Sequence, residues 1–149
     1  MQRAAVYLYR RNLPHWRVAE ATYFVTWRLA AGQPELSAPE RSLIVSSLKH
    51  FDHQRYELFA AVVMNDHVHT LVAPLDTWAL EHIVHGWKSF TTNQLHRRHG
   101  RAGRVWQSEY FDRVVRDEAE MLEKATYILG NPWKRWPDLE DYPWVSVRD

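Results

Sequence analysis

Residues 56–74 read YELFAAVVMNDHVHTLVAP, and this stretch predicts a β-hairpin. Its first part, Tyr56 to Met64, is an apolar run of residue types that favour strands. Asn65 and Asp66 are typical turn residues, and His67 to Ala73 predicts a second strand, which Pro74 ends. Because the turn is so short, we expect the two strands to form a tight hairpin.

The segments on either side of the hairpin predict further strands and helices. We expect a strand at 22–30, a helix at 39–51 capped by Ser37, a helix at 78–98 capped by Thr77, a strand at 110–116, and a last helix that begins at 117 or 118 and ends near Asn131. That end is expected because Pro132 disfavours helical backbone at the residue before it. The order β-α-β-β-α-β with an extra C-terminal helix predicts an α+β fold with a ferredoxin-like antiparallel sheet.

The composition indicates one folded domain across residues 1–149. Hydrophobic residues make up 46% of the chain, which excludes a disordered protein. Residues 132–149 are rich in Pro and Trp, so we expect an extended tail that packs on the body. The absence of Cys excludes disulfides, thiolate metal sites and a Cys nucleophile. We find no signal peptide and no membrane span in the sequence, so we expect a cytoplasmic protein.

Basic residues gather in two stretches, although the net charge is only +1. Residues 1–30 carry five Arg against one Glu, and residues 88–116 carry one Lys and six Arg against one Glu and one Asp. Such asymmetry is typical of a polyanion site on one face. Two solvated basic stretches separated by acidic ones would give the same pattern, and charge alone does not decide between these interpretations.

His67 and His69 form a His-Val-His motif in the second strand of the hairpin. Residues i and i+2 of a strand point to the same face, so both imidazoles project together while Val68 points to the other face. Two imidazoles side by side on a rigid strand make half of a metal site. The alternative is a chance pair, because the chain contains nine His.

Tyr127 and Asn131 lie four residues apart in the last expected helix, so they share one of its faces. An Asn carbonyl oxygen suits a hard divalent cation, and a phenol beside it would attack a phosphate that the metal polarises. The alternative is an amphipathic helix in which Tyr127 packs in the core and Asn131 ends the helix. The residues alone leave both interpretations open.

Two further segments combine aromatic and basic residues. Residues 87–93 read WKSFTTN and lead on to Arg97 and Arg98. This mixture suits a nucleic-acid backbone with stacked bases, and it equally suits a helix with a solvated basic face. Residues 104–113 read RVWQSEYFDR, which is unusually aromatic for a loop that leads into a strand. By themselves these residues indicate only packing and charge.

Together these segments resemble the single-tyrosine HUH transposases of insertion sequences, where HUH stands for His-hydrophobic-His. Within this superfamily the chain most resembles the REP-associated tyrosine transposases, the group associated with repetitive extragenic palindromes. Its motifs span nearly the whole chain, and their order and spacing together are specific. They are YFVTWRL at 23–29, VMNDHVH at 63–69, WKSFT at 87–91, VWQSEYFDR at 105–113, YILGNP at 127–132 and DYPW at 141–144.

The resemblance implies that His67 and His69 are metal ligands, Asn131 is a polar third ligand, and Tyr127 is the catalytic nucleophile. Mg²⁺ or Mn²⁺ suits two imidazoles and an amide oxygen better than a closed structural Zn²⁺ would. The implied partner is single-stranded DNA with hairpin or palindromic structure, bound by a monomer or homodimer. The implied reaction is transesterification, which leaves a 5′-phosphotyrosine and a free 3′-OH.

Five residues are candidates for contact with DNA. We expect Lys88, Arg113 and Arg116 to contact phosphates, because they are basic and belong to the resembling segments or lie next to them. Trp106 and Gln107 either hold the DNA hairpin or simply pack.

Lys124 and the two residues before the His pair also bear on the expected cleavage chemistry. Lys124 precedes Tyr127 by one helical turn and is a candidate to stabilise its phenolate; the alternative is a surface Lys near Glu120. The family often has Pro-Asn before the His pair, whereas this chain has Asn65 and Asp66. That change places a carboxylate next to the expected metal site.

Three other functions compete with that of a transposase, since one fold hosts many activities. A domesticated descendant would hold hairpin DNA without cutting it, but would not need the two His and the Tyr. A metal-dependent hydrolase of another class would turn over without a covalent adduct. An RNA-binding module would need aromatic residues in the middle strands, where His67 and His69 stand instead.

Overall fold

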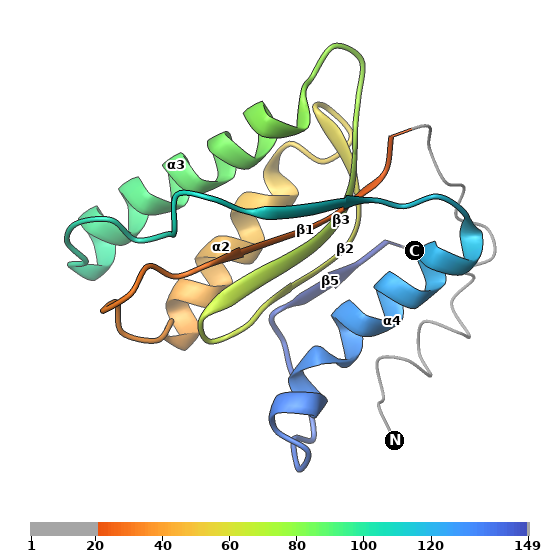
Figure 1. The fold of residues 1–149 in the computed structure, drawn as a ribbon. Coiled ribbons are helices and arrows are strands. Elements are labelled where there is room, and N and C mark those ends of the chain that lie inside the picture. Colours follow the sequence, from red (N-terminus) through yellow and green to blue (C-terminus); the bar gives the residue numbers. More distant parts are fainter. Residues whose placement is uncertain (1–20, 149) are drawn as a thin grey trace.

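A five-stranded antiparallel sheet forms the centre of the protein, with the strand order β4-β1-β3-β2-β5 (Figure 1). The structure is a computed structural model that describes residues 21–148. The strands are Tyr23–Arg28 (β1), Tyr56–Val63 (β2), His67–Pro74 (β3), Phe111–Val114 (β4) and Val145–Val147 (β5); the helices are Ala38–His50 (α2), Leu80–His99 (α3) and Glu118–Arg135 (α4). The expected α+β class and ferredoxin-like element order are confirmed. Most of the basic stretch at 1–30 lies outside the described residues.

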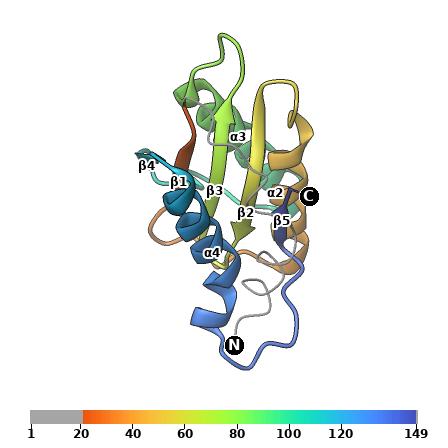
Figure 2. The same cartoon turned by 90° about the vertical axis from the view of Figure 1, so that its right-hand side faces the viewer.

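The sheet separates two helical layers, each with its own apolar core. Helices α2 and α3 cover one face and α4 covers the other, as Figures 1 and 2 show from two directions. The first core joins Trp27 and Val68 of the sheet to α2 and α3. The second joins Phe24 and Leu71 to α4. The alternation of side chains along each strand therefore decides which layer a residue serves.

The sequence predicts a cap for each of α2 and α3. The predicted cap of α2 is confirmed, and that of α3 is wrong. Ser37 caps α2 in a capping box: its Oγ accepts from the Glu40 amide (3.3 Å), while the Glu40 carboxylate accepts from the Ser37 amide (2.8 Å). Thr77 does not cap α3, which begins two residues later than expected, with Ala79 at the cap position. Thr77 lies instead in a turn, closed by the Trp78 amide donating to the Leu75 carbonyl (3.0 Å).

The expected end of the last helix near Asn131 is wrong, because α4 continues through Pro132 to Arg135. A proline inside a helix removes one backbone hydrogen bond and disfavours helical backbone at the preceding residue. Here the segment from Ile128 to Pro132 is buried. Its apolar residues Ile128 and Leu129 pack in the α4 core, and this burial offsets the local cost. The extended segment therefore begins after Arg135, not at residue 132.

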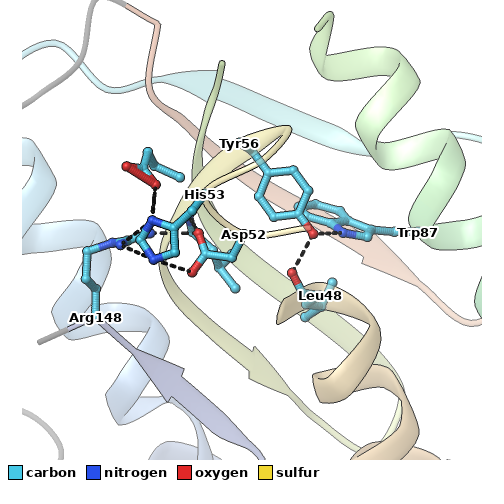
Figure 3. Close-up of polar contacts among 8 residues, drawn as sticks. Leu48, Asp52, His53, Tyr56, Trp87 and Arg148 are labelled. Carbon is cyan, nitrogen blue, oxygen red and sulfur yellow. Dashed lines mark hydrogen bonds and ion pairs between the residues drawn. The ribbon is translucent and has the colours of Figure 1, made fainter. Parts of the chain in front are cut away.

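The last residues close the edge of the sheet beside β2. Strand β5 pairs antiparallel with β2, and just before it the Tyr142 hydroxyl donates to the Val63 carbonyl (2.6 Å). Just after it, the Arg148 guanidinium donates to the carboxylates of Asp52 (2.7 Å) and Glu57 (3.3 Å), next to His53 (Figure 3). Within residues 21–148, no helix has the length and apolar character needed to cross a membrane.

A buried ion pair joins the first turn of α2 to the loop after α3. Arg101 contacts both carboxylate oxygens of Glu40, with Nε–Oε2 at 2.6 Å and Nη2–Oε1 at 2.8 Å. Both side chains are almost fully buried, at 5% and 6% exposure. Hydrogen bonds from Arg101 lower the pKa of Glu40 from 4.5 to about 2, against the opposing effect of burial. The basic loop at 100–103 is therefore held to the body, with Arg101 already paired.

Replacing Arg101 with Met would leave the Glu40 carboxylate buried without its cation. We expect R101M to lower the free energy of unfolding at pH 7 by about 3 kcal/mol. Since Glu40 has a depressed pKa in the folded state, its stabilisation is complete above its ordinary pKa of 4.5 and is lost as pH falls towards about 2. Urea denaturation between pH 7 and pH 3 should therefore show the difference from wild type shrinking with pH.

The matched control for this prediction is Arg104→Met, which removes an exposed Arg of the same loop. We expect this variant to change the free energy of unfolding by less than about 0.5 kcal/mol. An R101M protein as stable as wild type at pH 7 would show that the pair contributes no net stability.

Candidate active site

The two histidines of the His-Val-His motif lie together on the α4 face of the sheet. Strand β3 carries His67 and His69 with ring centroids 4.7 Å apart. Val68 points the other way, into the core beneath α2 and α3. The expected projection of both imidazoles from one face is therefore what the structure shows.

His69 is a buried, neutral imidazole with one nitrogen in use. Its ring is stacked on Phe24, and its Nδ1 lies 2.7 Å from the hydroxyl of Thr26 in the neighbouring strand β1. Burial is the main cause that lowers the pKa of His69 to about 3, and the nearby His67 and Arg28 add to it. Its Nε2 is buried and has no hydrogen-bond partner among the described residues. A neutral imidazole with a free nitrogen is the form that binds metal ions.

His67 is held between a carboxylate and an amide. Its Nδ1 donates to the Asp66 carboxylate at 2.7 Å, so the departure at position 66 contacts the expected ligand directly. Its Nε2 lies 3.3 Å from Oδ1 of Asn131 on α4. A carboxylate on one ring nitrogen orients the imidazole and makes the other nitrogen a better metal ligand. The structure thus brings together His67 and Asn131, which are 64 residues apart in the sequence.

Tyr127 lies one helical turn before Asn131 and packs against the imidazole of His69. Its ring centroid is 5.4 Å from that of His69 and 6.0 Å from that of Phe24. The side chain is 43% exposed and lines an open pocket of about 610 Å³, together with His69 and Lys124. The phenol is therefore supported by the protein on one side and accessible to a substrate on the other.

The donor atoms of this site fit a hard divalent cation. They are the orphaned Nε2 of His69, the Nε2 of His67 and the Oδ1 of Asn131, the last two 3.3 Å apart, as ligands of one ion can be. An arrangement of two imidazoles and one amide oxygen leaves positions open for phosphate and water. These three residues could hold the ion beside Tyr127.

A second group of potential ligands lies on the other side of β2, far along the chain from Tyr127. Ligand atoms of Asp52, His53 and Glu57 all lie within 4.8 Å of one another. The guanidinium of Arg148 already donates to both carboxylates, and Figure 3 shows it beside His53. The Arg148 guanidinium is thus already paired with both carboxylates of this group, which anchors β5.

Three candidate DNA contacts, Lys88, Trp106 and Gln107, differ in their burial and in what they contact. Trp106 is 3% exposed and donates its indole N–H to the Thr91 hydroxyl (2.9 Å), so its ring belongs to the core and is closed to DNA. Gln107 is exposed and lines the Tyr127 pocket. Lys88 donates to the carbonyls of Gln107 (2.7 Å) and Ser108 (3.1 Å), and burial lowers its pKa. Lys88 therefore positions the loop that carries Gln107.

The two arginines near β4 are both paired with one glutamate. Arg113 contacts Glu120 through Nε (2.7 Å) and Nη2 (2.6 Å), while the Nε of Arg116 lies 3.7 Å from the same carboxylate. Hydrogen bonds from Arg116 and Arg113 lower the pKa of Glu120. Both guanidiniums remain partly exposed, at 42% and 75% for the side chains of Arg113 and Arg116. They lie at the start of α4 rather than at the imidazoles.

Sequence reasoning does not single out Thr26 and Arg28, although both line the pocket with Tyr127. Thr26 pairs with His69 and Arg28 with His67 across the antiparallel β1–β3 ladder. The available signal is their spacing of two in an otherwise apolar strand, which places both on one face. A ferredoxin-like strand order then puts that strand next to the histidines.

Comparison with protein-family models gives a match that covers the residues of this site. The family model described as "Transposase IS200 like" matches residues 40–131, which include both histidines, Tyr127 and Asn131. A search of curated proteins finds no match.

Two solved structures have a similar fold. One is a REP-associated tyrosine transposase bound to a REP hairpin, with a TM-score of 0.68 at 18% identity over 88% of this chain and 79% of that chain. The other is a protein of Deinococcus radiodurans R1 described as a candidate transposase, with a TM-score of 0.55 at 18% identity over 72% of this chain and 88% of that chain. At such identities the likeness shows the fold alone.

The contact between Asp66 and His67 leads to a prediction about metal affinity. Asp66→Asn keeps the size of the side chain but removes the charge that orients the imidazole and raises its basicity. We expect the affinity for Mn²⁺ to fall about tenfold at pH 7 in isothermal titration calorimetry. The control is Asp138→Asn, an exposed carboxylate outside the site, which should leave the affinity unchanged. Equal affinities of D66N and wild type would exclude this role of Asp66.

Proposed function

The chain belongs to the family of IS200-like transposases, and we propose that it cuts and rejoins single-stranded DNA with Tyr127 as the nucleophile. Family membership supports a DNA transposase in general. The observation that carries the finer proposal is the convergence of Tyr127 and Asn131, from one face of α4, on the two imidazoles of β3. A protein that only binds DNA has no need of this arrangement.

We assign the metal ligands in this proposal to His67, His69 and Asn131, with Mg²⁺ or Mn²⁺ as the ion. When bound, the ion would stabilise the negative charge that develops on the phosphate oxygens. Thr26 and Asp66 hold the far nitrogens of the two imidazoles, so the near nitrogens face the site. The protein thus prepares the ligands through hydrogen bonds that are present before any substrate arrives.

The proposed chemistry is a direct exchange of one phosphodiester bond for another. The oxygen of Tyr127 attacks phosphorus, a phosphotyrosine bond forms, and the bond to the 3′ oxygen of the DNA breaks. The phenol gives up its proton and the departing strand gains one as its 3′-OH, so no nucleotide cofactor is needed. Lys124 lines the same pocket, with Nζ 5.2 Å from the Phe24 ring, and would stabilise the developing phenolate.

A second tyrosine lines the same pocket and provides an internal comparison. Burial raises the pKa of Tyr110, and the nearby carboxylates of Asp112 and Glu81 raise it further. A raised pKa disfavours loss of the phenolic proton, so Tyr110 is a poor nucleophile. Tyr127 instead lies against His69, within the proposed ligand set.

We propose hairpin-containing single-stranded DNA as the substrate. The similar REP-associated transposase was captured with a REP hairpin, and the exposed Gln107 and Arg28 line the open side of the Tyr127 pocket. Arg113 and Arg116 would add phosphate contacts at the start of α4, since their side chains keep exposed area beyond the pairing with Glu120.

A covalent trapping assay tests this function. Single-stranded oligonucleotides from the DNA flanking the gene, including its palindromes, are mixed with protein and Mn²⁺ or Mg²⁺. We expect a protein–DNA adduct on denaturing gels, with mass spectrometry placing it on Tyr127. Tyr127→Phe and His67→Ala should abolish the adduct, whereas Tyr110→Phe should retain it. Removal of the metal with EDTA should also abolish it.

The alternative function gives a different pattern in the same assay. A hairpin-binding protein that does not cut would bind the same oligonucleotides tightly without metal and form no adduct. That result would overturn the nuclease proposal and favour a DNA-binding module.

A further inference from the structure

A second pocket lies on the side of the sheet away from Tyr127, between α2 and α3. Its volume is about 580 Å³, similar to that of the Tyr127 pocket. We call it the α2–α3 groove, and the residues used below are His50, Arg55, His82, Gly86, Phe90 and Arg98. The five-stranded sheet separates this groove from the imidazoles of β3, so the two are different sites (Figure 1).

The floor of the groove is rigid and aromatic. Figure 3 shows the Tyr56 hydroxyl donating to the Leu48 carbonyl (2.6 Å) and accepting from the Trp87 indole N–H (3.0 Å). These bonds join β2, α2 and α3, and so hold the two walls at a constant separation. Beside this floor, Phe90 is 52% exposed, which is unusual for a large apolar side chain. The Tyr56 and Trp87 rings are 1% and 5% exposed and close the floor, so a flat aromatic ligand would stack on Phe90.

The cationic groups of the groove have no acidic counterpart. Arg55 and Arg98 line it with His50 and His82, and none of the described lining residues is Asp or Glu. The guanidinium of Arg55 is stacked 3.5 Å above the Phe51 ring, and Arg98 forms no ion pair with any residue between 21 and 148. An anion would therefore complement the rim of a pocket whose floor is apolar.

Gly86 keeps the groove open where a helix would ordinarily carry a side chain. It lies inside α3, where Gly is less favourable than Ala by about 1 kcal/mol. A Cβ built at this position meets no atom within 4 Å, so packing within the protein does not require a glycine. A ligand that approaches the helix backbone closely would require one.

We propose that the α2–α3 groove is an accessory site for single-stranded DNA, which takes one unpaired base against the exposed ring of Phe90 and the adjoining phosphate at Arg98. The combination of an exposed ring, cations without acidic neighbours and a glycine in the α3 wall suits a nucleotide better than an uncharged peptide. The site rests on DNA being the substrate, but it does not depend on cleavage. It would bind a part of the DNA strand that Tyr127 does not cut.

Photo-crosslinking tests this site directly. Full-length Tyr127→Phe protein, which we expect not to cleave, is mixed in EDTA with oligothymidine carrying a single 5-iodouracil, and crosslinked residues are found by mass spectrometry. We expect crosslinks at Phe90. Adding Gly86→Leu, whose Cβ meets no atom within 4 Å, places a side chain in the groove and should reduce these crosslinks at least about tenfold, while crosslinks in the Tyr127 pocket persist. Circular dichroism checks that the variant folds.

Two neighbouring arginines of α3 provide the charge control. Arg98→Ala should weaken binding of fluorescent oligothymidine about threefold at 0.1 M salt and reduce the slope of log affinity against log salt by about one. Arg97→Ala removes an exposed Arg that does not line the groove, and should change neither. If both substitutions weaken DNA binding equally, Arg98 acts only through general charge attraction, and the proposal is overturned.

The outcomes for the two sites are distinguishable. Crosslinks confined to the Tyr127 pocket, or groove crosslinks that survive Gly86→Leu, would overturn the accessory site and leave the proposed cleavage intact. Groove crosslinks that disappear in Gly86→Leu support the accessory site. They do so even if the wild-type protein forms no adduct on Tyr127, a result that would overturn only the cleavage proposal.

Discussion

The alternation of side chains along β3 is the constraint on which both halves of the molecule depend. Val68 and Val72 serve the core under α2 and α3, while His69 and Leu71 face α4. A shift of one residue in the pairing would turn both imidazoles into the core under α2 and α3 and turn the valines to the α4 face. The register is set by the short turn before β3, where the Met64 amide donates to the His67 carbonyl (2.8 Å). The proposed metal ligands are therefore positioned by the same turn that positions the core.

The position of His69 departs from what packing alone would favour. A side chain with only 3% exposure would ordinarily be apolar, and Thr26 satisfies just one of the two ring nitrogens. The other nitrogen is left without a partner among the described residues, at a cost of about 1–3 kcal/mol for such a buried group. Local departures from good packing rules are expected where a site is built. An ion at Nε2 is a physical reason for this departure that packing does not provide.

Local signals in the sequence predicted the elements, and long-range packing decided what those signals could not. The hairpin, the Ser37 cap and the shared face of Tyr127 and Asn131 follow from turn chemistry and periodicity within a few residues. The passage of α4 through Pro132 does not, because it depends on burial against the distant sheet. Nor does the burial of Trp106, since a loop sequence does not reveal a partner such as Thr91 on another element. The sequence shows Asp66 as a departure from the family pattern, but not its bond to His67, which depends on how the two side chains are oriented.

The aromatic and basic run in α3 shows why composition alone could not assign it to one surface. Successive helical residues are rotated by about 100°, so a short run is divided among different neighbours. Trp87 turns into the core and forms the floor of the groove, whereas Lys88 holds the loop of Gln107 at the Tyr127 pocket. Phe90 faces solvent at the groove. One helix thus lines the groove on one side and contacts a loop of the Tyr127 pocket on the other. The distance between the two pockets is therefore set by α3 and not by a flexible linker.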